Sequence, residues 1–205
     1  EGAYICDLLS MLLCMRIYDT MSNQIRDLEP KDPGKVSIYA CGPTVQDVPH
    51  LGHARTALTY DVLKRYLEWA GFEVFLVSNI TDIDDKIIKR ALDEGISEEQ
   101  LALKYANIHI DQLQNFGIKD PDERPRATEF IQQMITIIEE LMENGSAYEI
   151  QGSGIYFDTS KFDGYGALVN RSVEELRDSA KARIATDEEK DDPLDFALWK
   201  TAKPG

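Results

Sequence analysis

The chain has 205 residues, of which 43% are hydrophobic and 29% charged, and these values are typical of a folded globular protein with one domain, or one domain carrying an insertion. They exclude collagen-like, intrinsically disordered and membrane-embedded classes. A formal net charge of −15 repels phosphate backbones overall, so contact with a nucleic acid requires a local basic patch or a further segment. Three cysteines are too few for a disulfide framework and favour a reducing, cytoplasmic location.

The first segment, residues 1–14, reads EGAYICDLLSMLLC and is apolar. It lacks the basic region and cleavage site of a secretory signal and is too short to span a bilayer. The following MRIYDTMSNQI, opened by Met15, is typical of the start of a compact domain. We therefore treat residues 1–14 as an extension of unclear origin and expect neither a targeting signal nor a membrane anchor.

A strand, a helix and a second strand are predicted over residues 35–80. The run VSIYACG is bounded by glycine and proline on both sides, which predicts a buried strand ending near Cys41. Apolar residues then recur at helical spacing up to Gly71, and FEVFLVSNI predicts a second strand. Two strands joined in this way are parallel with a right-handed crossover. The predicted apolar side of the helix consists of Leu51, Ala54, Leu58, Val62, Tyr66 and Trp69.

Three more helices are predicted downstream. Thr81 and Asp82 are the predicted cap of DIDDKIIKRALDEG, and Ser97 with Gln100 has the spacing of a capping box for the next helix. A third helix runs from about residue 127 to 144 and ends at Gly145. Its predicted apolar side consists of Phe130, Met134, Ile137, Ile138 and Leu141.

The sequence pattern changes from about Ala147 onwards. Two short β-type runs flank Gln151-Gly152-Ser153-Gly154, which predicts a β-hairpin. This break predicts an insertion or second subdomain over 147–205. Residues 174–192 are highly charged and predict a solvated helix or loop.

Two of the three histidines, His50 and His53, flank Gly52 at the predicted strand-to-helix junction. A helix N-terminus presents free backbone N–H groups and the positive end of the helix dipole, and imidazoles there can donate to phosphate oxygens. Gly52 lets a base or a phosphate approach the backbone. The pattern therefore predicts a nucleotide-phosphate site. Two alternatives stay open: His50 only caps the helix while His53 packs, or both join Cys41 in a mixed zinc site.

Other polar residues admit simpler interpretations. Asp82, Asp84 and Asp85 suggest a magnesium site, but acidic residues in a first helical turn also complement the helix dipole, and we favour that interpretation. His109, in the middle of KYANIHIDQL, is expected to be an ordinary surface or packing histidine. Cys41 lies at the strand end where open α/β sheets place their ligand crevices.

The string YACGPTVQDVPHLGHART resembles the signature stretch of cysteinyl-tRNA synthetases, class I synthetases that use an H-x-G-H motif. The resemblance continues in order through NITDIDDKIIKRA, RPRATEFI, GIYFDTSKF and DFALWK, and it covers nearly everything from Met15 to Gly205. It implies an α/β fold with a Rossmann-like, HUP-type parallel sheet and flanking helices. Residues 15–146 would form the N-terminal half of the catalytic domain, and 147–205 a connective-peptide-like insertion containing the hairpin.

The resemblance also implies roles for individual residues. Cys41 would be a zinc ligand, and the zinc would bind the thiolate of the substrate L-cysteine, which it prefers to a serine hydroxyl. Gly42 and Thr81 would line the cysteine pocket. ATP, with Mg²⁺, would be handled by Thr44, His50, Gly52 and His53, of which His50 and His53 would be catalytic. The acceptor implied for the full-length enzyme is tRNA(Cys).

In the family the other zinc ligands, the K-M-S-K-S loop, the second half of the nucleotide-binding fold and the anticodon-binding parts lie beyond the stretches matched here. We therefore expect this chain by itself to bind zinc poorly and to have little activity. An uncovered strand edge and apolar face also predict self-association or marginal stability.

Three other functions are weighed against this one. A cysteine:glucosaminyl-inositol ligase of mycothiol synthesis resembles the same family, but PTVQDVPHLGH and TDIDDK are more similar to the synthetase. A small H-x-G-H nucleotidyltransferase would explain the phosphate site but not the Cys41 string. A non-catalytic, synthetase-derived fragment would act only as a binding or structural module.

Overall fold

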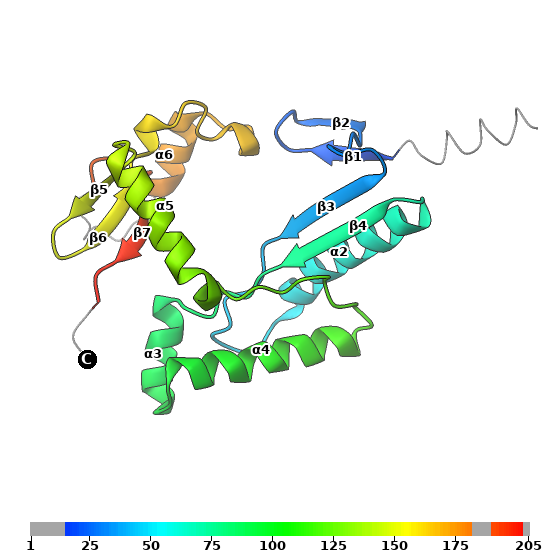
Figure 1. The fold of residues 1–205 in the computed structure, drawn as a ribbon, viewed down its shortest axis with the longest axis horizontal. Helices are drawn as coiled ribbons and strands as arrows, with labels where there is room; N and C mark the ends of the chain where they lie inside the picture. Colours follow the sequence, from blue (N-terminus) through cyan, green and yellow to red (C-terminus); the bar gives the residue numbers. More distant parts are fainter. Residues whose placement is uncertain (1–14, 182–189, 203–205) are drawn as a thin grey trace, which may run out of the picture. The chain divides into compact units, whose positions relative to one another are not determined.

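A computed structural model describes residues 15–181 and 190–202 of the chain. The chain divides into two compact units, one containing Leu28–Ile131 and the other containing Arg16–Asp27 and Gln132–Gly205. Each unit is described by itself (Figure 1). The domain boundary near residue 147 stays a prediction.

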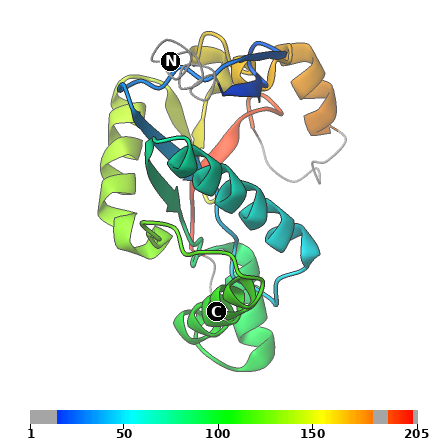
Figure 2. The same ribbon diagram turned by 90° about the vertical axis from the view of Figure 1, so that its right-hand side faces the viewer.

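The first unit is built on the parallel pair β3 (Lys35–Ala40) and β4 (Glu73–Ser78), joined by helix α2 (Leu51–Trp69). The register runs from Lys35 opposite Glu73 to Ala40 opposite Ser78. Helix α2 lies along one face of these strands (Figure 2). The predicted strand–helix–strand order is confirmed, and β3 ends at Ala40, directly before Cys41.

The apolar side predicted for α2 does not face the core. Leu58, Val62 and Trp69 are 48%, 55% and 70% exposed, whereas the buried residues of the helix are Asp61, Lys64 and Leu67. The physical reason is that the inner side of α2 carries the charged residues Asp61 and Lys64, which form hydrogen bonds with other segments. Lys64 donates to the carbonyl oxygen of Val74 at 3.0 Å and to Asp122 at 2.7 Å, and Asp61 accepts from the backbone N–H of Lys119 at 3.2 Å. A buried charge is tolerated when it is paired in this way.

Helices α3 (Asp85–Glu94) and α4 (Glu98–Asn115) complete the first unit. The predicted Thr81–Asp82 cap of α3 is wrong, because Asp84 occupies the N-cap and accepts from the backbone N–H of Lys86 at 2.9 Å. The Ser97–Gln100 capping box of α4 is confirmed. The helices pack in one apolar cluster made of Val45, Ile80, Ile87, Ala91, Leu101, Ala102, Tyr105 and Ala106.

The predicted third helix begins as a 3-10 turn, Ala127–Phe130, and continues as α5 (Ile131–Glu143). Gly145 follows with a positive φ of 76°, as expected of a residue that ends a helix. Of the residues predicted to form its apolar side, Ile138 is buried, whereas Phe130, Met134 and Ile137 are 43%, 36% and 56% exposed.

The second unit contains the predicted hairpin, formed by β5 (Ala147–Ile150) and β6 (Gly154–Phe157). Strand β7 (Phe196–Lys200) pairs with β6 and completes an antiparallel sheet in the order β5-β6-β7. The carboxylate of Asp195, only 2% exposed, accepts from the backbone N–H of Thr159 at 2.9 Å and from the Tyr148 hydroxyl at 2.8 Å. This buried acceptor ties the start of β7 to the hairpin.

Further elements of this unit include a second hairpin, β1 (Arg16–Asp19) with β2 (Gln24–Asp27), which the sequence pattern did not predict. Short 3-10 turns cover Thr159–Lys161 and Ala167–Val169, and α6 covers Val173–Lys181. The charged stretch 174–192 is therefore helical at its start, while 182–189 lie outside the described residues. None of the helices among the described residues has the length and apolar character needed to cross a membrane.

Candidate functional site

The loop that follows β3 is fixed against the loop that follows β4. The backbone N–H of Gly42 donates to Oδ1 of Asn79 at 2.8 Å, and Thr81 donates its backbone N–H to the carbonyl of Pro43 at 3.0 Å. Thr44 and Thr81 form a parallel bridge. Because a Cβ on Gly42 would lie 1.5 Å from the Asn79 carbonyl oxygen, only glycine fits there. Gly42, Thr44 and Thr81 thus meet at the carboxyl ends of the two strands.

Cys41 is exposed at this edge. Its Sγ lies 3.8 Å from the carbonyl oxygen of Gly42. Within residues 15–181 and 190–202, no three His, Cys, Asp or Glu side chains gather closely enough to hold a metal ion. The alternative of a zinc site formed by Cys41, His50 and His53 is therefore wrong, and Cys41 alone does not fit zinc as a tetrahedral centre.

The H-x-G-H motif begins α2 as a capping box made of histidines. His50 is the N-cap, and its Nδ1 accepts from the backbone N–H of Gly52 at 3.0 Å. The Nδ1 of His53 accepts from the backbone N–H of His50 at 3.1 Å, and the two ring centroids lie 4.0 Å apart. Because an accepting Nδ1 has no proton, each neutral ring bears its proton on Nε2, which can donate to a ligand. His50 does cap the helix, as the simpler interpretation held, but the cap uses only one nitrogen of each ring.

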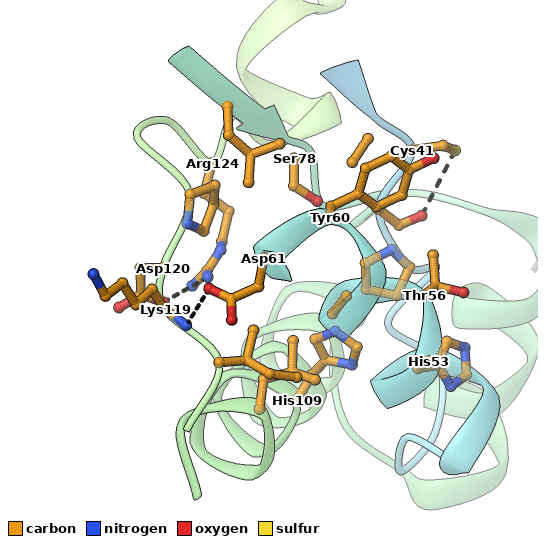
Figure 3. A pocket seen from close by; sticks show the side chains of 18 of the residues that line it. Cys41, His53, Thr56, Tyr60, Asp61, Ser78, His109, Lys119, Asp120 and Arg124 are labelled. Carbon is orange, nitrogen blue, oxygen red and sulfur yellow. Dashed lines mark hydrogen bonds and ion pairs between the residues drawn. The ribbon is translucent and has the colours of Figure 1, made fainter. Parts of the chain in front are cut away.

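A cavity of about 400 Å³ opens beside this motif (Figure 3). Four of the predicted site residues line it, namely Cys41, Gly42, Thr44 and His53. His50 instead lines a smaller hollow of about 180 Å³ between the start of α2 and the end of α4, and Gly52 and Thr81 line neither. The structure therefore joins the end of β3 to the second histidine of the motif, and it leaves His50, Gly52 and Thr81 outside the lining of this cavity.

The cavity also contains polar residues that the sequence interpretation missed. His109 and Arg124 lie on its wall, as do Thr56, Tyr60, Asp61, Ser78, Lys86, Lys119 and Asp120. Arg124 donates to Asp120 at 2.6 Å. Lys86 and Lys119 are further cations on the wall, and Asp61 and Asp120 are carboxylates there, so the wall carries charges of both signs. No sequence periodicity connects residues of α2 with Lys119, Asp120 and Arg124. Only the fold shows that they line the same cavity.

His109 is buried, with 8% of its surface exposed, and its ring meets that of His53 edge-on at a centroid distance of 5.8 Å. Burial lowers the pKa of His109 to about 4, helped by the nearby His53 and Arg124. Burial also lowers the pKa of His53, with a further contribution from His50. His109 is thus a packing histidine, as expected, but it packs on a motif histidine and is neutral at physiological pH.

The carboxylates considered for magnesium have structural partners instead. Asp82 accepts from the backbone N–H of Thr128 at 3.0 Å and from its hydroxyl at 2.7 Å. Asp84 caps α3, and Asp85 lies in its first turn. Asp84 and Asp85 agree with the favoured interpretation, in which acidic residues stabilise the start of a helix, whereas Asp82 lies before α3 and contacts Thr128 instead.

Comparison with known proteins connects this arrangement to a family. The profile of the tRNA synthetases class I (C) catalytic domain matches residues 27–205. The cysteine--tRNA ligase of Geobacillus thermodenitrificans is 45% identical over 191 residues, which cover 93% of this chain and 40% of that protein. That of Pyrococcus horikoshii is 47% identical over 193 residues, covering 94% and 40%. The chain therefore spans about 40% of the length of these curated relatives.

A solved structure with a similar fold is the ternary complex of Agrobacterium radiobacter LeuRS with tRNA and LeuAMS. The TM-score is 0.53 at 17% identity, and the match covers 65% of this chain and 17% of that chain. At this identity the likeness concerns the fold alone, and it confirms the predicted Rossmann-like architecture. The profile match and the identities to cysteine--tRNA ligases confirm the resemblance seen in the motifs, and the chain belongs to the class I (C) tRNA synthetase family.

Proposed function

We propose that this chain is the N-terminal part of the catalytic domain of a cysteine--tRNA ligase. The full-length enzyme would activate L-cysteine with ATP and transfer it to tRNA(Cys) in the cytoplasm. The observation that carries the proposal is the cavity that joins Cys41, Gly42 and Thr44, at the end of β3, to His53, at the start of α2. A cavity of about 400 Å³ with converging polar groups is of the size that small-molecule sites have.

The proposed chemistry begins with attack of the cysteine carboxylate on the α-phosphate of ATP. A P–O bond to the carboxylate forms, the bond to the leaving pyrophosphate breaks, and cysteinyl-adenylate results. A tRNA hydroxyl then attacks the activated carbonyl and AMP departs. Negative charge develops on the phosphate oxygens in the first step, so fixed hydrogen-bond donors lower its barrier, typically by ~3 kcal/mol each.

In this proposal the start of α2 supplies the donors. The positive end of the helix dipole attracts the triphosphate, and the Nε2–H groups of His50 and His53 donate to its oxygens. The Nδ1 contacts at 3.0 and 3.1 Å fix which nitrogen of each ring bears the proton. Gly52 presents no side chain to the incoming nucleotide. Thr44, in the loop after β3, would also contact ATP.

Gly42 and Thr81 would position the cysteine substrate, since they are held together at the strand ends by Asn79 and Pro43. Cys41 is the described residue that we assign as a ligand to a zinc ion in the full-length enzyme. Because the described residues offer no further ligands near it, no step is derived through zinc. We also propose that the chain alone binds zinc weakly and activates cysteine slowly.

The test is ATP binding to the 205-residue chain by calorimetry, with His53→Ala compared with Thr59→Ala. Thr59 lies on the same helix and is exposed. Its hydroxyl donates a hydrogen bond to the carbonyl oxygen of Arg55 at 2.9 Å. We expect His53→Ala to weaken ATP binding roughly tenfold to a hundredfold, and Thr59→Ala to leave it unchanged. Equal affinity of the two variants would contradict the proposed site.

The acceptor is tested separately. Offering tRNA(Cys) and glucosaminyl-inositol to the full-length enzyme distinguishes the synthetase from the mycothiol-type ligase. Transfer of cysteine to the aminosugar rather than to tRNA would replace the proposed function by the alternative one.

A further inference from the structure

His109 lies on α4, far along the chain from the H-x-G-H motif, yet its ring is on the wall of the same cavity as His53. With 8% exposure it is among the few buried polar residues of the first unit. Among the described residues, none forms a hydrogen bond with its ring nitrogens, and its ring contact is with His53. Its nitrogens are nonetheless not sealed in the core, because the buried side-chain N or O atom without a partner among the described residues is Oε1 of Gln46.

The contact between the two rings has a defined geometry. The rings are 83° apart with centroids separated by 5.8 Å, an edge-to-face arrangement that aromatic pairs favour. In Figure 3 the His109 ring lies between His53 and Arg124, which agrees with the influence of both groups on its proton affinity. The Nδ1 of His53 also accepts from the backbone N–H of His50 at 3.1 Å. The His53 ring is therefore contacted both by the start of α2 and by α4.

We propose that His109 is a positioning residue, whose ring packs edge-to-face with that of His53 and holds it in the single orientation in which Nδ1 stays on the backbone and Nε2 stays available to a ligand. This inference rests on the proposed function, in which that Nε2–H donates to a phosphate oxygen. Within the motif, His50 contacts the His53 ring through this hydrogen bond and through its own ring, with the centroids 4.0 Å apart. The ring of His109 adds a contact from α4 that limits the remaining tilt of His53, so the donor is aligned before the nucleotide arrives.

Three variants separate positioning from simple packing. His109→Phe keeps a ring edge against His53 while removing both nitrogens. His109→Leu and His109→Met fill the space with apolar atoms but present no ring, and the flexible methionine protects against failure of the leucine variant to fold. A packing role predicts that all three behave alike. A positioning role predicts that phenylalanine substitutes for histidine and that leucine and methionine do not.

The first measurement is long-range ¹H–¹⁵N correlation spectroscopy of the histidine rings in the ligand-free chain. With three histidines in the sequence, His53 is assigned from the signals lost in His53→Ala. We expect one sharp Nε2–H tautomer for His53 in the unmodified chain and in His109→Phe, and averaged or broadened signals in the Leu and Met variants. Unchanged His53 signals in a folded Leu or Met variant would overturn the inference.

The second measurement is ATP affinity of the same chains. We expect a loss of about three- to tenfold for the Leu and Met variants, the range of one aromatic edge contact, and restoration of affinity by phenylalanine. The two measurements distinguish the two proposals. If the unmodified chain does not bind ATP, the proposed function fails, whereas the ring spectra still decide whether His109 positions His53.

Discussion

The carboxylate of Asp82 receives two hydrogen bonds from Thr128, from its backbone N–H at 3.0 Å and from its hydroxyl at 2.7 Å. The pair connects the segment before α3 to the 3-10 turn Ala127–Phe130. Asp82 is 8% exposed, so its charge depends on these donors. This contact gives the acidic residue at this position a structural partner.

Loss of this contact is expected to destabilise the first unit. Thr128→Val removes the hydroxyl donor while keeping the shape, and should lower the free energy of unfolding by about 1.5–3 kcal/mol, as for hydrogen bonds to charged groups. Thr128→Ser keeps the donor and should cost less than about 1 kcal/mol. Urea unfolding followed by circular dichroism measures both. A strong increase in stability on adding Mg²⁺ would instead indicate that Asp82 is a metal ligand.

Gly42→Ala is expected to distort the edge of the sheet. The added Cβ would lie 1.5 Å from the carbonyl oxygen of Asn79, so one of the two loops must move, at a cost of about 2–4 kcal/mol. Asn79→Ala is the matched control. It removes the acceptor of the Gly42 N–H at 2.8 Å and the donor to the Thr81 hydroxyl at 3.3 Å, and should cost about 1–2 kcal/mol. Thermal unfolding of both variants compares them, and equal stability of Gly42→Ala and the unmodified chain would refute the close approach.

The stability of the chain is expected to fall in mild acid because of His109. Its pKa is about 4 in the folded state, below the ordinary value of 6.5, so the unfolded chain binds more protons between these values. Stability from this group is therefore complete above pH 6.5 and is lost progressively down to pH 4. Between pH 7.5 and 5 the loss should reach about 2 kcal/mol.

His109→Phe is the control for this acid dependence, since phenylalanine cannot titrate. Urea unfolding at both pH values should show a loss smaller by about 2 kcal/mol in His109→Phe than in the unmodified chain. An identical acid loss in the two proteins would mean that His109 titrates normally in the folded state.

The outward side of α2 is expected to drive self-association. Leu58, Val62 and Trp69 are 48–70% exposed on this helix, and in the described part of the chain β3 pairs only with β4, so one of its edges is open. Parallel sheets are normally covered on both faces, and open edges promote association. Val62→Glu should therefore shift sedimentation towards the monomer. An already monomeric unmodified chain would contradict this expectation.

Much of the fold was predictable because it depends on local patterns. The β3–α2–β4 order followed from glycine and proline boundaries and from hydrophobic spacing, and the Ser97–Gln100 box followed from its S-x-x-Q spacing. Asp84 rather than Asp82 caps α3 because Asp82 is engaged by the distant Thr128. The orientation of α2 was also mispredicted, because spacing gives the apolar side of a helix but not whether another element covers it.

The sequence by itself determined the family, through motifs whose order is preserved along the chain, and it located the start of a helix at His50, Gly52 and His53, where we propose that the nucleotide binds. Only the tertiary structure decided that Asp61 and Lys64 face inward, because their partners lie on β4 and on the segment after α4. Only it brought His109 against His53, since contacts between helices distant in sequence depend on how the chain packs and leave no periodic signal.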